Sequence, residues 1–166
     1  MAAHYLYNCM DVLDIGCYKL PITMFLRGQH ERVWCIDPLL DQQPEVVEKS
    51  ICVGTRLVVV HARFIRKKCE EVDLSSFQTN FGLVALGVDV GVDVDRLAQL
   101  IRRASVTVLE APSRYAPGLQ AVQRARELSG RSEAFRIKLD LSASGVPRHI
   151  SDSFPTYYER ELVVIR

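Results

Sequence analysis

The feature that most constrains this chain is the alternation of short apolar runs with amphipathic stretches. Runs such as 11–16 (DVLDIG) and 56–60 (RLVVV) are rich in branched side chains and end at Gly, Pro or charged residues, as strands do. Between such runs lie stretches such as 93–103, whose apolar residues recur at helical spacing. This alternation is typical of βαβ units, which build a mostly parallel sheet covered by helices.

The pattern predicts the elements of one α/β domain over residues 1–166. We expect strands at 11–16, 32–36, 56–60 (extending toward 65), 81–86, 105–109, 135–141 and 161–165, and helices at 21–27, 41–49, 93–103 and 117–128. No helix separates the last two strands, and strands joined without a crossover pair antiparallel. The prediction is therefore a three-layer α/β/α sandwich, with a mostly parallel seven-stranded sheet and an antiparallel last strand.

Composition narrows the class of protein. The chain has 166 residues and 48% hydrophobic content, which fits one domain with a real core. Its 21 basic and 20 acidic residues balance to a net charge of +1, so nothing demands nucleic acid or an acidic membrane as partner. Neither a signal peptide nor a membrane-length apolar stretch is visible, so we expect a cytoplasmic protein. The cysteine spacings fit no zinc pattern, and no metal is predicted.

Three segments carry recognisable motifs. Residues 12–17 (VLDIGC) are similar to the pattern hydrophobic-hydrophobic-D-x-G-x-G, residues 33–37 (VWCID) form a strand ending in an acid, and residues 81–84 (FGLV) are similar to F-D-L-V. In these motifs the chain resembles the class I S-adenosylmethionine-dependent methyltransferases, from about Asp11 to the C-terminus. The resemblance implies a Rossmann-like fold, S-adenosylmethionine as cofactor and methyl transfer as the reaction.

The ends of the first two strands supply the residues for a ligand site. Open α/β sheets bind ligands at the carboxyl ends of their strands, near the switch in strand order. Gly16 ends the first strand, where a missing Cβ lets a ligand approach the backbone. Asp37 ends the second strand about twenty residues later, a spacing that suits a carboxylate bound to ribose hydroxyls. By the resemblance, Asp14 would lie near the methionine end of the cofactor. The implied cofactor site comprises Asp14, Gly16, Cys17, Tyr18, Asp37, Pro38 and Gly87.

The acceptor is expected at the end of the fourth strand. Methyl transfer is an in-line displacement, so the protein mainly holds the acceptor close and aligned. Asp89 is the predicted catalytic residue, which would orient or deprotonate the acceptor. The alternative is that Asp89, Asp93 and Asp95 are solvated acids that start the next helix. Glu110, which ends the fifth strand, is a weaker candidate for the site.

The cofactor loop departs from the family pattern. Tyr18 and Leu20 stand where the family has glycines, Gly82 replaces the usual Asp, and Lys68 lies near the position of an acid that often follows the third strand. Either Tyr18 caps the cofactor or the site no longer binds it. The leading function is methyl transfer to an unidentified small molecule; the alternative is a catalytically inactive binding or scaffold protein. A nicotinamide-binding domain is a third interpretation, but its G-x-G-x-x-G fingerprint is absent.

Two surface features complete the predictions. No large insertion interrupts the core, so we expect either a small substrate or a pocket completed by a homodimer or a partner subunit. The run 63–68 (RFIRKK) is basic with one aromatic residue and could contact phosphates, although a solvated surface is the simpler interpretation. The motif N-P-P-Y, typical of amino-group methylation in nucleic acids, is absent, and nucleic acid is not an expected partner.

Overall fold

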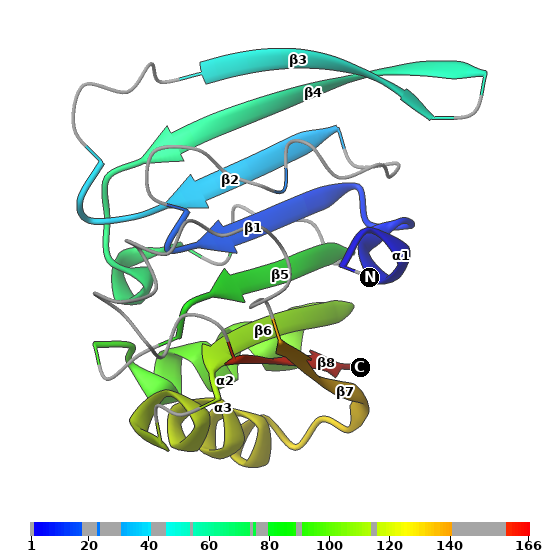
Figure 1. Cartoon of the computed structure of the whole chain (residues 1–166). Helices are drawn as coiled ribbons and strands as arrows, with labels where there is room; N and C mark the ends of the chain where they lie inside the picture. The colour runs from blue at the N-terminus through cyan, green and yellow to red at the C-terminus, as the bar shows by residue number, and fades with distance from the viewer. Residues whose placement is uncertain are drawn as a thin grey trace, which may run out of the picture.

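In the computed structural model of the protein, the described strands form one sheet (Figure 1). The structure describes residues 2–17, 23, 31–40, 46–53, 55–73, 75, 80–88, 91–113, 116–140 and 159–166. The strands of these ranges are β1 (Asp11–Ile15), β2 (Arg32–Ile36), β3 (Val46–Val53), β4 (Arg56–Ile65), β5 (Phe81–Leu86), β6 (Val106–Pro112), β7 (Glu133–Asp140) and β8 (Glu159–Ile165). The helices are α1 (Ala2–Leu6), α2 (Val94–Arg103) and α3 (Ala116–Ser129), with a 3-10 turn, η2 (Cys69–Glu71).

The strand order confirms the predicted fold class. In the described residues the sheet has eight strands in the order β3-β4-β2-β1-β5-β6-β8-β7. β1 pairs in parallel with β2 on one side and with β5 on the other. Strands that follow β1 in the sequence are therefore added to the sheet first on one side of β1 and then on the other. β8 runs antiparallel to both β6 and β7, as predicted for the last strand. The switch in strand order therefore lies at β1 and β5, where the carboxyl ends of parallel strands meet.

The predicted helix at 41–49 is wrong over residues 46–49. These residues begin β3, which pairs antiparallel with β4 from Val46↔Arg63 to Val53↔Arg56 and adds an eighth strand at the sheet edge. The segment 46–53 (VVEKSICV) carries branched residues at both ends, and these favour an extended backbone. The charged residues at its centre suit an edge strand. The same residues are also typical of a surface helix, which is why the sequence predicted one. Residues 41–45 lie outside the described ranges.

The other predicted elements are confirmed within a few residues wherever the structure describes them. β4 continues to Ile65, and α2 begins after Asp93, whose side chain accepts a hydrogen bond from the backbone N–H of Arg96 at 2.8 Å. That bond satisfies one of the otherwise unpaired donors of the first helical turn. The predicted helix at 21–27 lies outside the described residues except for Thr23.

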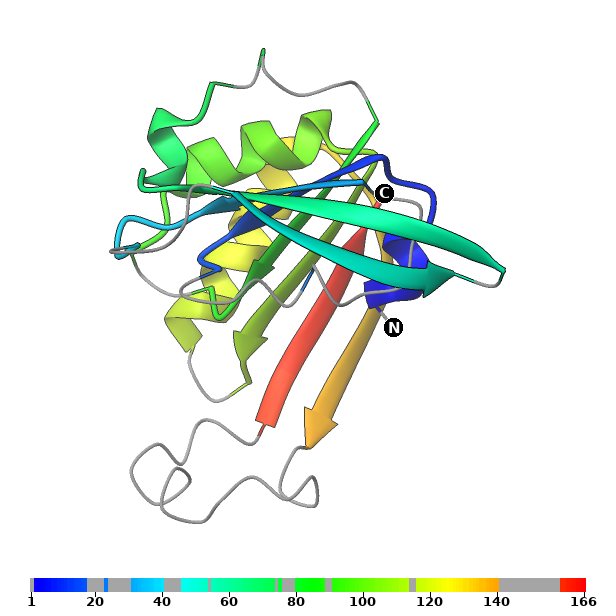
Figure 2. The ribbon, with the colours of Figure 1, turned by 90° about the horizontal axis from the view of Figure 1, so that it is seen from above.

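Apolar side chains fill both faces of the sheet. On one face α2 and α3 bury Leu97, Ile101 and Val122 against Leu13 and Leu83. On the other face α1 lies over a second cluster that contains Leu6, Val12, Cys35 and Val108 (Figure 2). No helix among the described residues is long and apolar enough to span a bilayer.

Gly82, which replaces the family's usual Asp, is explained by the packing of α1. A Cβ atom built on Gly82 would collide with Leu6 Cδ2 and would lie 3.0 Å from Cys9 Sγ. Leu6 is fully buried and Cys9 is 3% exposed, so neither side chain has free space beside it. A carboxylate at this position would displace α1 and be buried without water.

We predict that Gly82→Ala lowers the free energy of unfolding by about 1–3 kcal/mol, because the added methyl overpacks the contact with α1. Leu6→Ala alone should cost about 2–5 kcal/mol through the cavity it leaves. In the double variant the new methyl occupies part of that cavity, so the combined loss should be smaller than the sum. Urea unfolding of the four proteins measures the coupling, and additive losses would contradict this explanation of Gly82.

Candidate functional site

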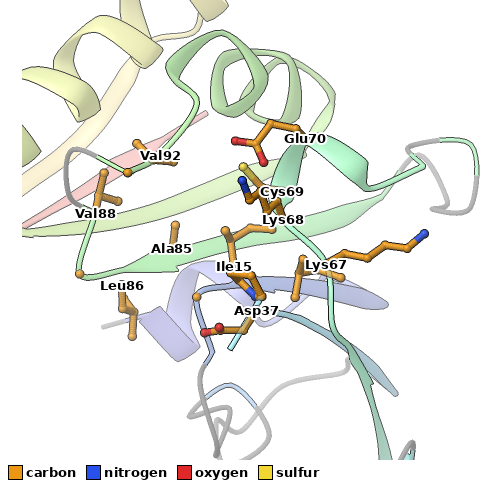
Figure 3. A pocket seen from close by; sticks show the side chains of 15 residues that line it. Ile15, Asp37, Lys67, Lys68, Cys69, Glu70, Ala85, Leu86, Val88 and Val92 are labelled. Atoms are coloured by element: carbon orange, nitrogen blue, oxygen red, sulfur yellow. The ribbon is translucent and has the colours of Figure 1, made fainter. Parts of the chain in front are cut away.

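A cavity opens at the carboxyl ends of the central strands. Its volume is about 390 Å³, within the range of small-molecule sites. Gly16 and Asp37 both line it, so the two residues chosen from the sequence face the same space. The lining residues that Figure 3 labels are Ile15, Asp37, Lys67, Lys68, Cys69, Glu70, Ala85, Leu86, Val88 and Val92.

Two glycines shape the rim of the cavity. Gly16 and Gly87 follow β1 and β5, and each has a φ of 74°, in the left-handed region that side chains disfavour. The Gly16 N–H donates to the carbonyl of Ile36 at 2.8 Å, which ties the end of β1 to β2. Among the described residues, a Cβ atom on Gly16 would meet only the carbonyl oxygen of Leu86, at 3.9 Å. The turn therefore requires glycine for its backbone conformation more than for space.

Asp37 is held at the rim by its own turn. Its N–H donates to the carbonyl of Ile65 at 3.2 Å, and its Oδ1 accepts the N–H of Leu39 at 2.8 Å. The residue is 6% exposed, and Pro38 beside it also lines the cavity. These bonds fix the carboxylate where β2 ends, as a group that can accept hydrogen bonds from a ligand.

Asp14 lies behind the rim rather than on it. Side chains alternate along β1, so Asp14 shares the face of Val12 and the second apolar cluster, and it is not among the residues that line the cavity. Its Oδ2 accepts a hydrogen bond from Thr23 Oγ1 at 2.7 Å. Burial raises the pKa of Asp14 from 3.8 to about 6, while the bond from Thr23 opposes the rise. Cys17 is buried in the same cluster.

A buried carboxylate supports the loop after β5. Glu110 Oε2 accepts the N–H of Gly87 at 2.7 Å and Nη2 of Arg160 at 2.6 Å, and its Oε1 pairs with Arg160 Nε. The carbonyl of Glu110 also accepts the N–H of Val88 at 2.9 Å. Glu110 thus positions two residues of the cavity wall, whereas sequence reasoning ranked it low and missed Arg160. An arginine near the start of an apolar strand carries no signal for this contact.

Basic residues form the outer wall. Lys67 and Lys68 line the cavity just after β4, together with Glu70. In Figure 3 the head groups of Lys68 and Glu70 lie near each other, whereas the Lys67 side chain extends away from them. The run 63–68, for which the sequence suggests either phosphate contacts or a solvated surface, ends with two residues that line this cavity. This wall therefore carries both cations and an acid.

The structure brings together four of the predicted site residues and places two others away from the cavity. Gly16, Asp37, Pro38 and Gly87 share the cavity, while Asp14 and Cys17 lie behind it. The remaining two, Tyr18 and Asp89, lie outside the described residues. Apolar walls with one fixed carboxylate and backbone turns suit a nucleoside, whose base is apolar on its faces and whose sugar donates hydrogen bonds.

Comparison with known proteins bears on the fold. No protein-family model matches the sequence, and neither does any curated protein. Among solved structures, the N-methyltransferase NodS from Bradyrhizobium japonicum, in complex with S-adenosyl-L-homocysteine, matches with a TM-score of 0.59 at 11% identity, over 99% of this chain and 83% of that one. The fold is that of the class I methyltransferases.

Two further solved structures share this methyltransferase fold. An S-adenosylmethionine-dependent methyltransferase from Clostridium acetobutylicum matches with a TM-score of 0.54 at 9% identity, over 99% of this chain and 85% of that one. TrmK from M. capricolum, in complex with S-adenosyl-homocysteine, matches with a TM-score of 0.54 at 10% identity, over 99% of this chain and 65% of that one. At these identities the likeness defines the architecture, and the site of this chain must be judged on its own residues.

We predict that Asp14→Asn changes stability in a pH-dependent way. Folding raises the pKa of Asp14 from 3.8 to about 6, so the native state binds the proton more tightly than the unfolded chain. The stability of the unmodified protein should then fall as the pH rises through this window and remain lower above it. Asn is neutral and keeps an acceptor for Thr23. Near pH 4 the two proteins should be similar, and near pH 8 the variant should be more stable by about 3 kcal/mol.

Urea unfolding at both pH values tests this prediction. The matched control is Asp95→Asn, which removes an exposed carboxylate from the first turn of α2 and should show no comparable pH dependence. A stability difference between Asp14→Asn and the unmodified protein that is the same at both pH values would contradict the raised pKa.

Proposed function

We propose that this protein binds S-adenosylmethionine in the cavity at β1, β2 and β5 and transfers its methyl group to a small-molecule acceptor. One observation carries the proposal: Gly16 and Asp37, which end adjacent parallel strands, line the same cavity of about 390 Å³. This is the place in the sheet where α/β folds bind nucleoside ligands. The structural neighbours NodS and TrmK, both solved with S-adenosyl-homocysteine, support the choice of cofactor.

Each part of the cavity has a role in this proposal. When bound, the cofactor supplies an electrophilic methyl group. Asp37 accepts hydrogen bonds from the ribose hydroxyls, which its fixed orientation favours over water. Ile15, Ile36 and Val92 form apolar walls that hold the base and exclude solvent. The turn at Gly16 lets the backbone approach the ligand closely.

The acceptor side lies next to Gly87 and Val88. The buried Glu110–Arg160 pair holds this segment, so the wall against which an acceptor packs is preorganised. We propose that Asp89, which follows in the sequence, orients the acceptor or removes its proton. Asp14 lies on the face of β1 opposite the cavity, and we propose that it supports the methionine end of the cofactor.

The substitutions in the cofactor loop motivate a second candidate function. Tyr18 and Leu20 replace glycines of the family motif, so the chain could be a binding or scaffold relative without catalysis. Either function is proposed for a cytoplasmic protein, and a homodimer or partner subunit would complete a pocket with no inserted cover. Measurement of cofactor binding separates the two functions.

We predict that calorimetric titration with S-adenosylmethionine or S-adenosylhomocysteine shows micromolar binding. Asp37→Ala should weaken binding about 10- to 100-fold, because hydrogen bonds to a charged group are lost. Asp37→Asn should weaken it less, since the amide oxygen can still accept the Leu39 N–H and one ribose hydroxyl. Asp95→Ala removes an exposed acid of α2 and should leave binding unchanged.

The absence of heat at millimolar ligand would remove the proposed cofactor and favour the scaffold. In that case Tyr18→Gly identifies the cause: binding gained by this variant would show that the loop substitution closes an otherwise competent site. Equal weakening by Asp37→Ala and Asp95→Ala would show that the ligand binds elsewhere.

A further inference from the structure

The outer wall of the cavity is a short segment that follows β4. Residues 67–70 all line the cavity, and the last two belong to the 3-10 turn η2. Its backbone hydrogen bonds run from the Glu71 N–H to the Lys68 carbonyl at 3.1 Å and from the Val72 N–H to the Cys69 carbonyl at 3.3 Å. Because a single turn is too short to fix its own position, the shape of the wall depends on contacts with the rest of the fold.

Apolar packing brings this turn against α2. Cys69 and Val72 are buried in the same core cluster as Leu97 and Leu100 of α2. Packing of this kind has no preferred direction, so it holds the turn close to α2 without fixing how the turn is rotated. Directional contacts must decide which groups of the turn face the cavity.

Arg96 of α2 supplies these directional contacts. Its Nε donates to the carbonyl of Cys69 at 3.3 Å, and its Nη2 donates to the carbonyl of Val72. The third nitrogen of the guanidinium, Nη1, donates to Oε1 of Gln99 at 2.8 Å, about one turn further along the helix. The planar guanidinium therefore spans η2 from its first residue to the residue that follows it, and Gln99 holds the guanidinium in that orientation.

The helix that carries Arg96 also begins at the cavity. Gly91 and Val92 line the cavity, and Asp93 is the N-cap of α2, whose side chain accepts the N–H of Arg96 at 2.8 Å. The backbone N–H of Asp93 also donates a hydrogen bond to the thiol of Cys69. Arg96 is thus bonded to the N-cap beside one wall of the cavity and to the turn that forms another.

We propose that Arg96 is a positioning residue for the ligand, because it locks the outer wall to the start of α2 and so keeps two sides of the cavity in place before the ligand binds. Binding then loses little free energy in ordering the wall. Arg96 is not among the residues that line the cavity, so it acts through Cys69 and its neighbours. The effect on the ligand rests on the proposed function, whereas the fixing of the wall does not.

The thiol of Cys69 can report the position of the wall. Its side chain is 8% exposed, and burial is the main cause that raises its pKa from 9.0 to about 11, so alkylation by iodoacetamide should be slow. Arg96→Ala should raise the alkylation rate of Cys69 at pH 8 by about 10- to 100-fold, because the released turn enters water and forms more thiolate. Mass spectrometry of the separate peptides measures this rate. Cys35, fully buried in the other core cluster, reports opening of the whole domain, and its rate should stay unchanged.

Calorimetric titration with S-adenosylhomocysteine measures the effect on the ligand. Arg96→Ala should weaken binding about tenfold, through the cost of ordering the wall. Arg96→Lys keeps the charge but lacks the planar fork that bridges two carbonyls, so it should restore part of the affinity and of the Cys69 protection. The matched control Arg102→Ala removes an arginine of the same helix that donates to the carbonyl of Leu128 at 2.8 Å, and it should change neither quantity.

Three results would overturn the proposal. The first is a Cys69 alkylation rate that Arg96→Ala leaves unchanged, and the second is an increase that Cys35 or the Arg102→Ala variant shares. The third is an increase confined to Cys69 that leaves the affinity for S-adenosylhomocysteine unaltered, since the ligand would then not need a fixed wall. If the unmodified protein binds no cofactor, the proposed function fails, and the alkylation rates still decide whether Arg96 holds the wall.

Discussion

The parallel pairing of β1 with β2 and β5 is the constraint on which the rest of the structure depends. Because the three strands run in register, Ile15 lies beside both Ile36 and Ala85, and the turns that follow them open at the same edge. Gly16, Asp37 and Gly87 thereby reach one cavity although they are far apart in the sequence. Helix packing on both faces holds the pairing, since a slip of one residue would move every buried side chain to the opposite face.

Behind this edge, two buried carboxylates accept hydrogen bonds from neighbouring side chains or backbone N–H groups. Glu110 joins Gly87 to Arg160, and Asp14 accepts the hydroxyl of Thr23. A buried charge is costly unless it is paired, so the ion pair with Arg160 holds Glu110 in place beside Gly87. Asp14 has one hydroxyl donor and a pKa raised by burial, whereas Glu110 has a full cationic partner. Glu110 therefore ties down the segment after β5, where the proposed acceptor would sit.

In the part of the chain that the structure describes, helices cover the sheet unevenly. α2 and α3 protect the strands beyond β1, while β3 adds to the sheet edge instead of covering a face. Trp34 of β2 and Arg63 of β4 line a separate hollow on the face that α2 and α3 share.

The sequence by itself determined the α/β class, most strand positions and the location of Gly16 and Asp37 at the same edge of the sheet. These features depend on local periodicity and on where strands end. It misassigned residues 46–49, because the polar residues at the centre of the segment 46–53 are equally compatible with an exposed helix and with an edge strand. Only the tertiary structure decided that Asp14 lies behind the rim, that Glu110 binds Arg160, and that Trp34 meets Arg63. These contacts join residues whose proximity depends on sheet order and side-chain face, and neither quantity is encoded in a local pattern.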